Sequence, residues 1–398
     1  MTTQKTNIGQ RAVIAIIGKR NAGKSTLLNQ LIGEEISIVS DTPGTTTDSV
    51  FKAYELLPYG PVVFYDTAGL DDTQDELGQK RVKASEKIIQ RADLILYVIG
   101  KDGASKDIKD ELERMQNNNI KFIPVFNFAD CTPQNQTDKD ICSLYHGVRV
   151  SAKTKDGIDL LKKRIIDTLQ SISTPPALLQ NLITPKDVVL LVTPIDTAAP
   201  KGRMILPQVQ VTREILDNDA IVITAKVNEI SNVLQSLKKQ PDLVITDSQA
   251  VKEVNTLIPQ KIPLTTFSML FARSKGNFFQ MAKGIDAVKT LKNNAKILIA
   301  EGCSHHVTCD DIGRVKIPTM LKKYSQKELN FEFTSGYDFP ENIKDYDLII
   351  HCGGCMLNHM EIKRRLRVCE QQNIPVTNYG MIISLMQGVF ERTSAPLI

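Results

Sequence analysis

Short apolar runs alternate with amphipathic segments along most of the chain. In the first 172 residues the apolar runs are RAVIAIIG, PVVFYD, DLILYVIG, KFIPVFN and GVRV, and helix-like segments separate them. Strands that alternate with helices in this way are typical of a parallel sheet covered by helices. We therefore predict an α/β domain over residues 1–175.

The same alternation continues beyond a proline-rich stretch, SISTPPALLQNLITP, which we interpret as a linker. The runs DVVLLVTPID, AIVITAKV, DLVITDS and KIPLTTF then predict a second, smaller α/β domain over residues 183–267. A helix-like run then extends from Ser268 to Lys292. After it, the runs AKILIAEG, NFEFTSG, DYDLIIHCG and IPVTNYG predict a third α/β domain over residues 268–398. The sequence thus predicts an α/β protein of three domains, each with a largely parallel sheet flanked by helices.

Composition and charge exclude several classes of protein. With 398 residues, 42% hydrophobic and 24% charged, the chain is long and apolar enough for more than one globular core. A net charge of +4 gives no field that would argue for nucleic acid as a partner. The amino-terminal stretch is polar and no apolar segment reaches 18 residues, so we expect a cytoplasmic protein without a membrane partner. Seven cysteines, an odd number, favour free thiols or metal ligands over a disulfide framework.

Residues 18–25, GKRNAGKS, form a phosphate-binding motif between a predicted strand and a predicted helix. Gly18 and Gly23 allow the tight loop whose backbone N–H groups face phosphate. Lys24 reaches the outer phosphates, and the Ser25 hydroxyl can bind Mg²⁺. The predicted nucleotide contacts in this region are Gly18, Asn21, Ala22, Gly23, Lys24, Ser25 and Thr26.

Two further segments complete a triphosphate site. Asp66 ends the run PVVFYD and is suited to hold Mg²⁺ through water, and the N–H of Gly69 can sense a γ-phosphate. Thr46, in DTPGTTTD, offers the hydroxyl that closes over Mg²⁺ in the triphosphate state, although a plain turn is the alternative for that segment. We predict that Lys24, Thr46, Asp66 and Gly69 are the catalytic residues, and that Ser25 and Thr46 contact the metal.

The residues that select the base follow two later strands. Asn127 and Asp130 come at the end of KFIPVFN, and Ser151, Ala152 and Lys153 come at the end of GVRV. Asp130 can accept two hydrogen bonds from the ring N–H and amino group of guanine, which adenine cannot supply. The predicted cofactors of this domain are therefore GTP or GDP with Mg²⁺.

The order and spacing of these motifs resemble the translation-factor class of small GTPases. Asn21 and the GTTTD segment resemble the potassium-activated subgroup that includes the tRNA-modification GTPase MnmE. In that subgroup the matching Asn helps to ligate K⁺ in place of an arginine finger; the alternative for Asn21 is a cap of the loop. Phe128 replaces the Lys of the family's Asn-Lys-x-Asp motif, which implies a lower nucleotide affinity. Leu70 stands where Ras-like enzymes have a catalytic Gln, so the resemblance implies slow hydrolysis.

Two cysteine motifs, GCSHH and HCGGC, each follow a predicted strand. Because the carboxyl ends of parallel strands meet at one edge of a sheet, we expect Cys303, His305, His351, Cys352 and Cys355 to form a metal site. Their spacing leaves open a tetrahedral zinc site, a 4Fe-4S cluster on three cysteines with one open iron, or unligated structural cysteines. A Cys-x-x-Cys redox pair is a further alternative, but it leaves Cys303 and both histidines unexplained.

Together the GTPase motifs and the two cysteine motifs resemble the HydF family of FeFe-hydrogenase maturation GTPases over essentially the whole chain. The resemblance implies a scaffold that receives a transient di-iron subcluster precursor from two radical-SAM maturases and delivers it to apo FeFe-hydrogenase. It also implies a 4Fe-4S cluster on Cys303, Cys352 and Cys355 and a homodimer through the middle domain. His305 and His351 would then be weak exchangeable ligands or donors that tune the cluster. The competing hypothesis is a potassium-dependent GTPase with a structural zinc domain that acts in RNA modification or ribosome assembly.

Overall fold

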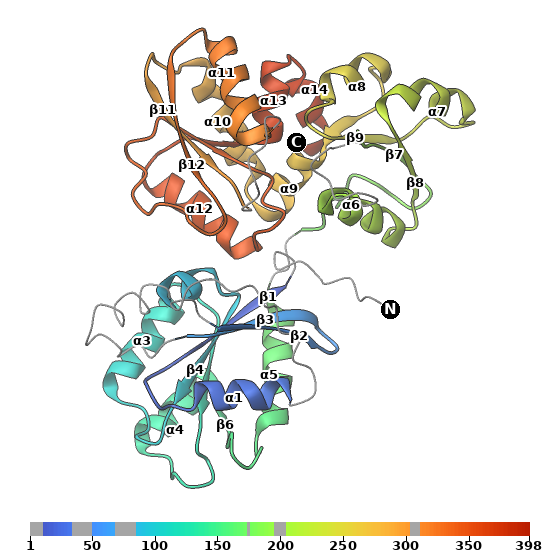
Figure 1. Cartoon of the computed structure of the whole chain (residues 1–398). Coiled ribbons are helices and arrows are strands. Elements are labelled where there is room, and N and C mark those ends of the chain that lie inside the picture. The colour runs from blue at the N-terminus through green and yellow to red at the C-terminus, as the bar shows by residue number, and fades with distance from the viewer. Residues whose placement is uncertain (1–10, 34–49, 68–84, 173–175, 195–203, 303–310) are drawn as a thin grey trace. The chain divides into compact units, whose positions relative to one another are not determined.

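The computed structural model describes residues 11–33, 50–67, 85–172, 176–194, 204–302 and 311–398. The chain divides into two compact units, 1–174 and 175–398 (Figure 1). The border between the units lies inside the proline-rich stretch. The border between the second and third predicted domains lies within the second unit, and the three-domain division stays a prediction.

The first unit is built on one six-stranded sheet with the order β2-β3-β1-β4-β5-β6. Its strands are β1 (Ala12–Ile17), β2 (Val50–Leu56), β3 (Gly60–Asp66), β4 (Leu94–Ile99), β5 (Phe122–Phe126) and β6 (Val148–Arg149). Strand β2 pairs antiparallel with β3, and the other neighbours pair in parallel. Strand β2 was not predicted from the sequence, because its residues, VFKAYEL, mix charged with apolar side chains, as the edge of a sheet allows.

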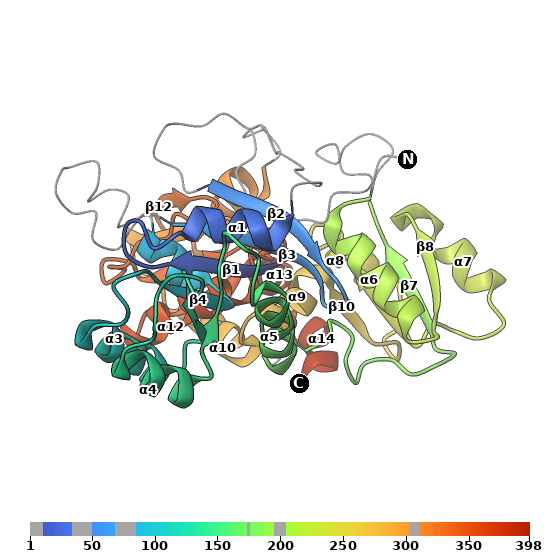
Figure 2. The same ribbon diagram turned by 90° about the horizontal axis from the view of Figure 1, so that it is seen from below.

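Helices cover both faces of this sheet (Figure 2). Side chains of β1 alternate between the two faces: Ile14 and Ile16 pack with α1 (Lys24–Ile32) and α5 (Ile158–Ser171). Val13, Ala15 and Ile17 pack on the opposite face with α3 (Lys106–Asn117) and α4 (Gln136–Tyr145). The parallel strands end at one edge of the sheet, and that edge is where proteins of this architecture bind ligands.

The second unit contains two four-stranded sheets whose neighbouring strands all pair in parallel. The first has the order β10-β9-β7-β8, with β7 (Val188–Val192), β8 (Ile221–Ala225), β9 (Leu243–Thr246) and β10 (Leu264–Thr266). The second has the order β12-β11-β13-β14, with β11 (Ala295–Ala300), β12 (Leu329–Thr334), β13 (Leu348–His351) and β14 (Val376–Asn378). The predicted α/β class with largely parallel sheets is confirmed.

One continuous hydrophobic core joins the two sheets of the second unit, and it includes Leu191 of β7 and Ile299 of β11. The helices are α6 (Leu206–Asp217), α7 (Ile230–Ser236), α8 (Val251–Leu257), α9 (Phe267–Lys275), α10 (Phe278–Lys289), α11 (Ile317–Ser325), α12 (His359–Gln371), α13 (Tyr379–Met386) and α14 (Phe390–Ser394). Helix α9 lies in the shared core through Phe267, Leu270 and Phe271. The two sheets are thus packed on common side chains.

One predicted helical run is divided in the structure. The run predicted from Ser268 to Lys292 is two helices, because α9 ends at Lys275 with Gly276 as its C-cap, and the side chain of Asn277 caps the start of α10. Helix α12 begins at His359, because the side chain of Asn358 accepts a hydrogen bond from the N–H of Glu361 as the cap. Local capping side chains decided both positions.

No helix in the described part of the chain is both long and apolar enough to cross a bilayer. The cytoplasmic location expected from the sequence stays a prediction. The same holds for the expectation that nucleic acid and membranes are not partners.

Candidate functional site

The loop between β1 and α1 has a backbone that requires glycine at two positions. Gly18 has φ 147° and Gly23 has φ 86°. A Cβ added to Gly18 would lie 2.3 Å from the carbonyl oxygen of Val98, and one added to Gly23 would lie 2.3 Å from Nδ2 of Asn127. Both contacts are too close for an added side chain, so these two positions of the loop require glycine.

Lys24, the first residue of α1, is buried inside this loop. Its Nζ donates hydrogen bonds to the carbonyl oxygens of Gly18 at 3.0 Å and Lys19 at 2.9 Å. The ammonium is therefore already held beside the loop, and the partial positive charge of the helix amino terminus adds to it. Asn21, at the exposed tip, has a left-handed backbone with φ 61°.

Ser25 and Asp66 join the start of α1 to the end of β3. The Ser25 hydroxyl donates to Oδ2 of Asp66 at 2.5 Å. The other carboxylate oxygen, Oδ1, is buried and has no hydrogen-bond partner within the described ranges. A hydroxyl beside a carboxylate with an open oxygen is a donor set that suits Mg²⁺, so these residues fit the predicted ion.

Asn127 connects the phosphate loop to both of the predicted base-reading segments. Its Nδ2 donates to the carbonyl oxygen of Ala22 at 3.1 Å. Its Oδ1 accepts hydrogen bonds from the N–H of Phe128 at 2.9 Å and the N–H of Ala152 at 3.1 Å. One buried side chain thus connects three loops. The structure brings the predicted residues Ala22, Asn127 and Ala152 together.

Asp130 follows β5 and is fully exposed, so its carboxylate can accept hydrogen bonds from a ligand. A hydrogen bond from Ser151 lowers the pKa of Asp130, and the charges of Lys153 and Lys101 act in the same direction. The carboxylate is therefore ionised at neutral pH, as the reading of guanine requires. Ser151 is itself held in place, because its hydroxyl accepts from the N–H of Thr154 at 3.1 Å.

Three predicted features of the nucleotide site lie outside the described residues: Thr46, Gly69 and Leu70. Thr26 is exposed on the first turn of α1. Their roles stay predictions.

The second candidate site lies at the carboxyl end of β13, where Cys352 and Cys355 follow the strand. The Cys352 sulfur accepts hydrogen bonds from the N–H of Gly302 at 2.9 Å and the N–H of Gly354 at 3.3 Å. Gly302 directly precedes Cys303, so the two cysteine motifs begin at one point of the sheet edge. Cys303 and His305 lie outside the described residues.

Burial governs the protonation of these cysteines. It raises the pKa of Cys352 to about 11, the charge of Cys355 acts in the same direction, and the N–H groups of Gly354 and Gly302 act against it. Burial also raises the pKa of Cys355. Without a bound cation both are thiols, and metal binding must release their protons. No group of three metal-ligating side chains occurs within the described ranges, which exclude Cys303.

Lys275, the last residue of α9, reaches into the cysteine loop. Its buried Nζ donates to the carbonyl oxygens of Leu357 at 2.8 Å, Gly354 at 3.2 Å and Cys355 at 3.3 Å. Burial lowers the pKa of Lys275 to about 8, and Cys355 and Cys352 act against that shift. Lys275 was not among the predicted site residues; a lysine at the end of the mostly apolar segment FSMLFARSK was the available signal.

His351 is buried at the end of β13. Its Nδ1 lies 2.8 Å from the carbonyl oxygen of Cys352, and its Nε2 lies 3.0 Å from Nη1 of Arg365. A guanidinium can only donate, so Nε2 accepts and Nδ1 carries the proton. Burial lowers the pKa of His351 to about 3, and Arg365 acts in the same direction. Both ring nitrogens are engaged by the protein, and a ligand role for His351 stays a prediction.

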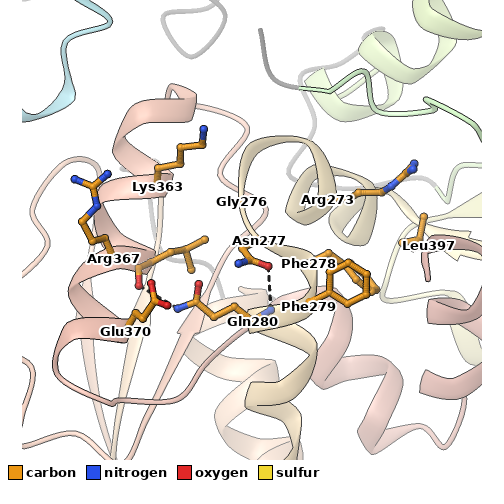
Figure 3. A pocket seen from close by; sticks show the side chains of 11 residues that line it. Arg273, Gly276, Asn277, Phe278, Phe279, Gln280, Lys363, Arg367, Glu370 and Leu397 are labelled. Carbon is orange, nitrogen blue, oxygen red and sulfur yellow. Dashed lines mark hydrogen bonds between the residues drawn. The ribbon is translucent and has the colours of Figure 1, made fainter. Parts of the chain in front are cut away.

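A separate groove of about 410 Å³ lies between α12 and the turn that joins α9 to α10 (Figure 3). Lys363 and Arg367 line it from α12, and Arg273 and the exposed Phe279 line the other side. Its lining contains neither Cys352 nor any residue predicted for the nucleotide.

Two family models match the second unit. The hydrogen maturase F dimerization domain matches residues 178–276, and the hydrogen maturase F tetramerization domain matches residues 279–396. The chain belongs to the hydrogen maturase F family. A third model, the 50S ribosome-binding GTPase, matches residues 13–128 of this hydrogen maturase F chain, so its first unit is a GTPase domain. The predicted family and the predicted GTPase are confirmed.

Curated relatives of this hydrogen maturase F chain include tRNA modification GTPases MnmE. The one from Chromobacterium violaceum is 34% identical over 160 residues, which is 39% of this chain and 34% of the relative. The one from Thermosipho melanesiensis is 36% identical over 162 residues, 40% of this chain and 35% of the relative. The chain therefore spans about a third of the length of the curated relatives it matches.

Similar solved structures include Aquifex aeolicus Era bound to GDP·AlF₄⁻, with a TM-score of 0.33 and 22% identity, over 62% of this chain and 97% of that one. The G domain of the T. maritima FeoB iron transporter has a TM-score of 0.31 and 20% identity, over 40% of this chain and 99% of that one.

Proposed function

We propose that this member of the hydrogen maturase F family is a GTPase scaffold for FeFe-hydrogenase maturation. It holds a 4Fe-4S cluster and delivers a di-iron subcluster precursor, its cargo, to apo-hydrogenase. The observation that carries this proposal is the match of both hydrogen maturase F models to the unit that contains the cysteine loop. Radical-SAM maturases are the proposed source of the cargo.

In the nucleotide site, Lys24, Ser25 and Asp66 would hold the phosphates and Mg²⁺, which neutralises charge that develops on the transferred phosphate. Asn21 would ligate K⁺, while Thr46 and Gly69 would respond to the γ-phosphate. The close contact of Ser25 with Asp66 and the unpartnered oxygen of Asp66 support the Mg²⁺ assignment. Hydrolysis is slow because Leu70 cannot orient water as the Gln of Ras-like enzymes does.

In the cysteine site, Cys303, Cys352 and Cys355 would bind three irons of the cluster, and the fourth iron would stay open to an exchangeable ligand. The N–H groups of Gly302 and Gly354 support this assignment, because such bonds stabilise the charge on ligating sulfur. The ammonium of Lys275 adds a positive charge beside the loop.

Self-association has support from the names of both family models. We assign a homodimer to the 178–276 region. Strand β8 lies at the edge of its sheet, and Ile221 on it and Leu216 on α6 are each 52% exposed. An apolar edge strand of this kind is a site for pairing with another chain.

GTP hydrolysis would govern exchange of partners rather than cluster chemistry. Ser25→Ala is therefore expected to stop delivery of the cargo to apo-hydrogenase while the iron content of the scaffold stays unchanged. A parallel fall in iron content would contradict this division of roles.

The cluster is tested by anaerobic reconstitution with iron and sulfide, followed by metal analysis and EPR of the reduced protein. We expect about four irons per chain and a spin-half signal. Both should be lost in Cys352→Ser and kept in Cys131→Ser, which changes an exposed cysteine of the GTPase unit. One tightly held zinc without a cluster signal would overturn the proposal and favour the structural-zinc alternative.

A further inference from the structure

Phe128 stands where the related GTPases carry the lysine of their base-recognition motif. It has a left-handed backbone with φ 61°, which is unfavourable for a bulky side chain and persists only where the surroundings impose it. A Cβ placed on Gly23 would lie 3.5 Å from the Cζ atom of the Phe128 ring. The ring therefore lies against the phosphate loop, beside the segments that read the base.

Lys101 brings an ammonium to this ring from a different loop. It follows β4, and its Nζ lies 5.0 Å from the centroid of the Phe128 ring, within cation–π range. Its loop packs closely against the phosphate loop, because a Cβ on Gly100 would lie 3.2 Å from the Cα of Ala22. The hydrogen bond from Ser151 is the main cause that lowers the pKa of Asp130, and the charges of Lys153 and Lys101 act in the same direction. Lys101 thus acts on both the ring and the base-reading carboxylate.

We propose that Phe128 and Lys101 together replace the missing motif lysine, with the Phe128 ring stacking on the purine and Lys101 fixing that ring and supplying the positive charge. A single lysine combines an apolar stem with an ammonium, and here two residues divide these parts. Aromatic rings stack on any base, so the selection of guanine remains with Asp130. This inference rests on the proposed GTP site and deepens it.

The first test measures the dissociation constant of N-methylanthraniloyl-GDP for the full chain. Lys101→Met should weaken binding by about two- to fivefold, the range of one exposed cation–π contact. Lys121→Met is the matched control, because this exposed lysine precedes β5 at the amino end of the sheet. It should leave the dissociation constant unchanged.

The decisive test repeats Lys101→Met in the background of Phe128→Lys. Phe128→Lys alone places a second ammonium group beside that of Lys101. The two positive charges repel each other, so this variant should bind the probe more weakly. Removing Lys101 then relieves the repulsion, so Lys101→Met should tighten binding in this background although it weakens binding in the natural chain. A change of the same sign in both backgrounds would overturn the inference. Tighter binding by Lys101→Met alone would also overturn it, because Lys101 would then merely cover the ring.

The outcome for the natural chain separates this inference from the proposed function. A natural chain that does not bind the GDP probe refutes the GTP site itself. A natural chain that binds the probe, with Lys101→Met unchanged, refutes only the division of roles between Phe128 and Lys101. Lys101 is exposed, so its substitution is compatible with the fold, and a circular-dichroism melt of each variant confirms this.

Discussion

The guanidinium of Arg365 lies 3.0 Å from Nε2 of His351, and both side chains are buried below the cysteine loop. Nε of Arg365 donates to Glu361 at 2.7 Å, and Nη2 donates to the carbonyl oxygen of Gly336 at 2.5 Å. The opposite nitrogen of His351 donates to the carbonyl oxygen of Cys352. Arg365 is therefore a positioning residue that acts on the cysteine loop through His351.

Loss of Arg365 should destabilise the second unit. Arg365→Met removes the buried partner of Glu361 and the donor to His351, so the free energy of unfolding should fall by about 3 kcal/mol. Arg364→Met is the control, because Arg364 bonds the same carboxylate from a more exposed position, and it should lower the free energy of unfolding by less than Arg365→Met does. Urea unfolding followed by circular dichroism measures both; equal costs would contradict the assignment.

Lys275 should matter for both the fold and the cluster. Lys275→Met leaves three loop carbonyls without their donor, so the free energy of unfolding should fall by about 2 kcal/mol. Iron retained after reconstitution and gel filtration should fall as well. Lys283→Met, at an exposed position of α10, should change neither quantity. Equal iron retention in the two variants would show that Lys275 does not support the loop.

The contact between Ser25 and Asp66 predicts a shared dependence on Mg²⁺. Ser25→Ala and Asp66→Asn should each lower the rate of phosphate release from GTP at saturating Mg²⁺ by about 100-fold, because each removes an oxygen ligand or its support. Ser171→Ala, at the far end of α5, is the control and should keep the natural rate. Unchanged phosphate release in Asp66→Asn would exclude this carboxylate from the metal site.

Asp130 should decide which base is bound. Asp130→Asn replaces an acceptor with an amide that can donate to the carbonyl of xanthine, so the preference should move from GDP toward xanthosine diphosphate. A bidentate contact of this kind is worth about 1–3 kcal/mol, which is about 5- to 150-fold in the ratio of dissociation constants. Competition between the two nucleotides measures that ratio, and a ratio equal to that of the natural chain would refute base reading by Asp130.

The affinity for GDP should be insensitive to mild acid. Binding requires the ionised carboxylate, and the pKa of Asp130 is lowered below its ordinary value, so the charge persists as pH falls. The dissociation constant should therefore stay constant from neutral pH to about pH 5, above the ordinary Asp value. Titration of N-methylanthraniloyl-GDP at each pH measures this. A loss of affinity near pH 6 would point to a different titrating group.

Contiguous patterns in the amino-acid sequence were enough for several conclusions. Residues 18–25 carry the phosphate-loop chemistry in one segment, and the structure gives Gly18 and Gly23 the backbone expected there. Uninterrupted apolar runs were enough to predict the buried parallel strands. Strand β2 was not predicted, because an edge strand buries less apolar surface and its pattern of apolar residues is correspondingly weaker.

The partners of the cysteine loop depended on packing between distant elements. Lys275 reaches the carbonyl of Leu357 across 82 positions of sequence, and only the way α9 packs on the second sheet brings them together. Phe128 was visible as a departure from a motif, but its contact with Lys101 arises because two parallel strands end side by side. Periodicity and motif chemistry are local properties of a chain, whereas the contacts that position buried charges are made by elements that meet only in the folded core.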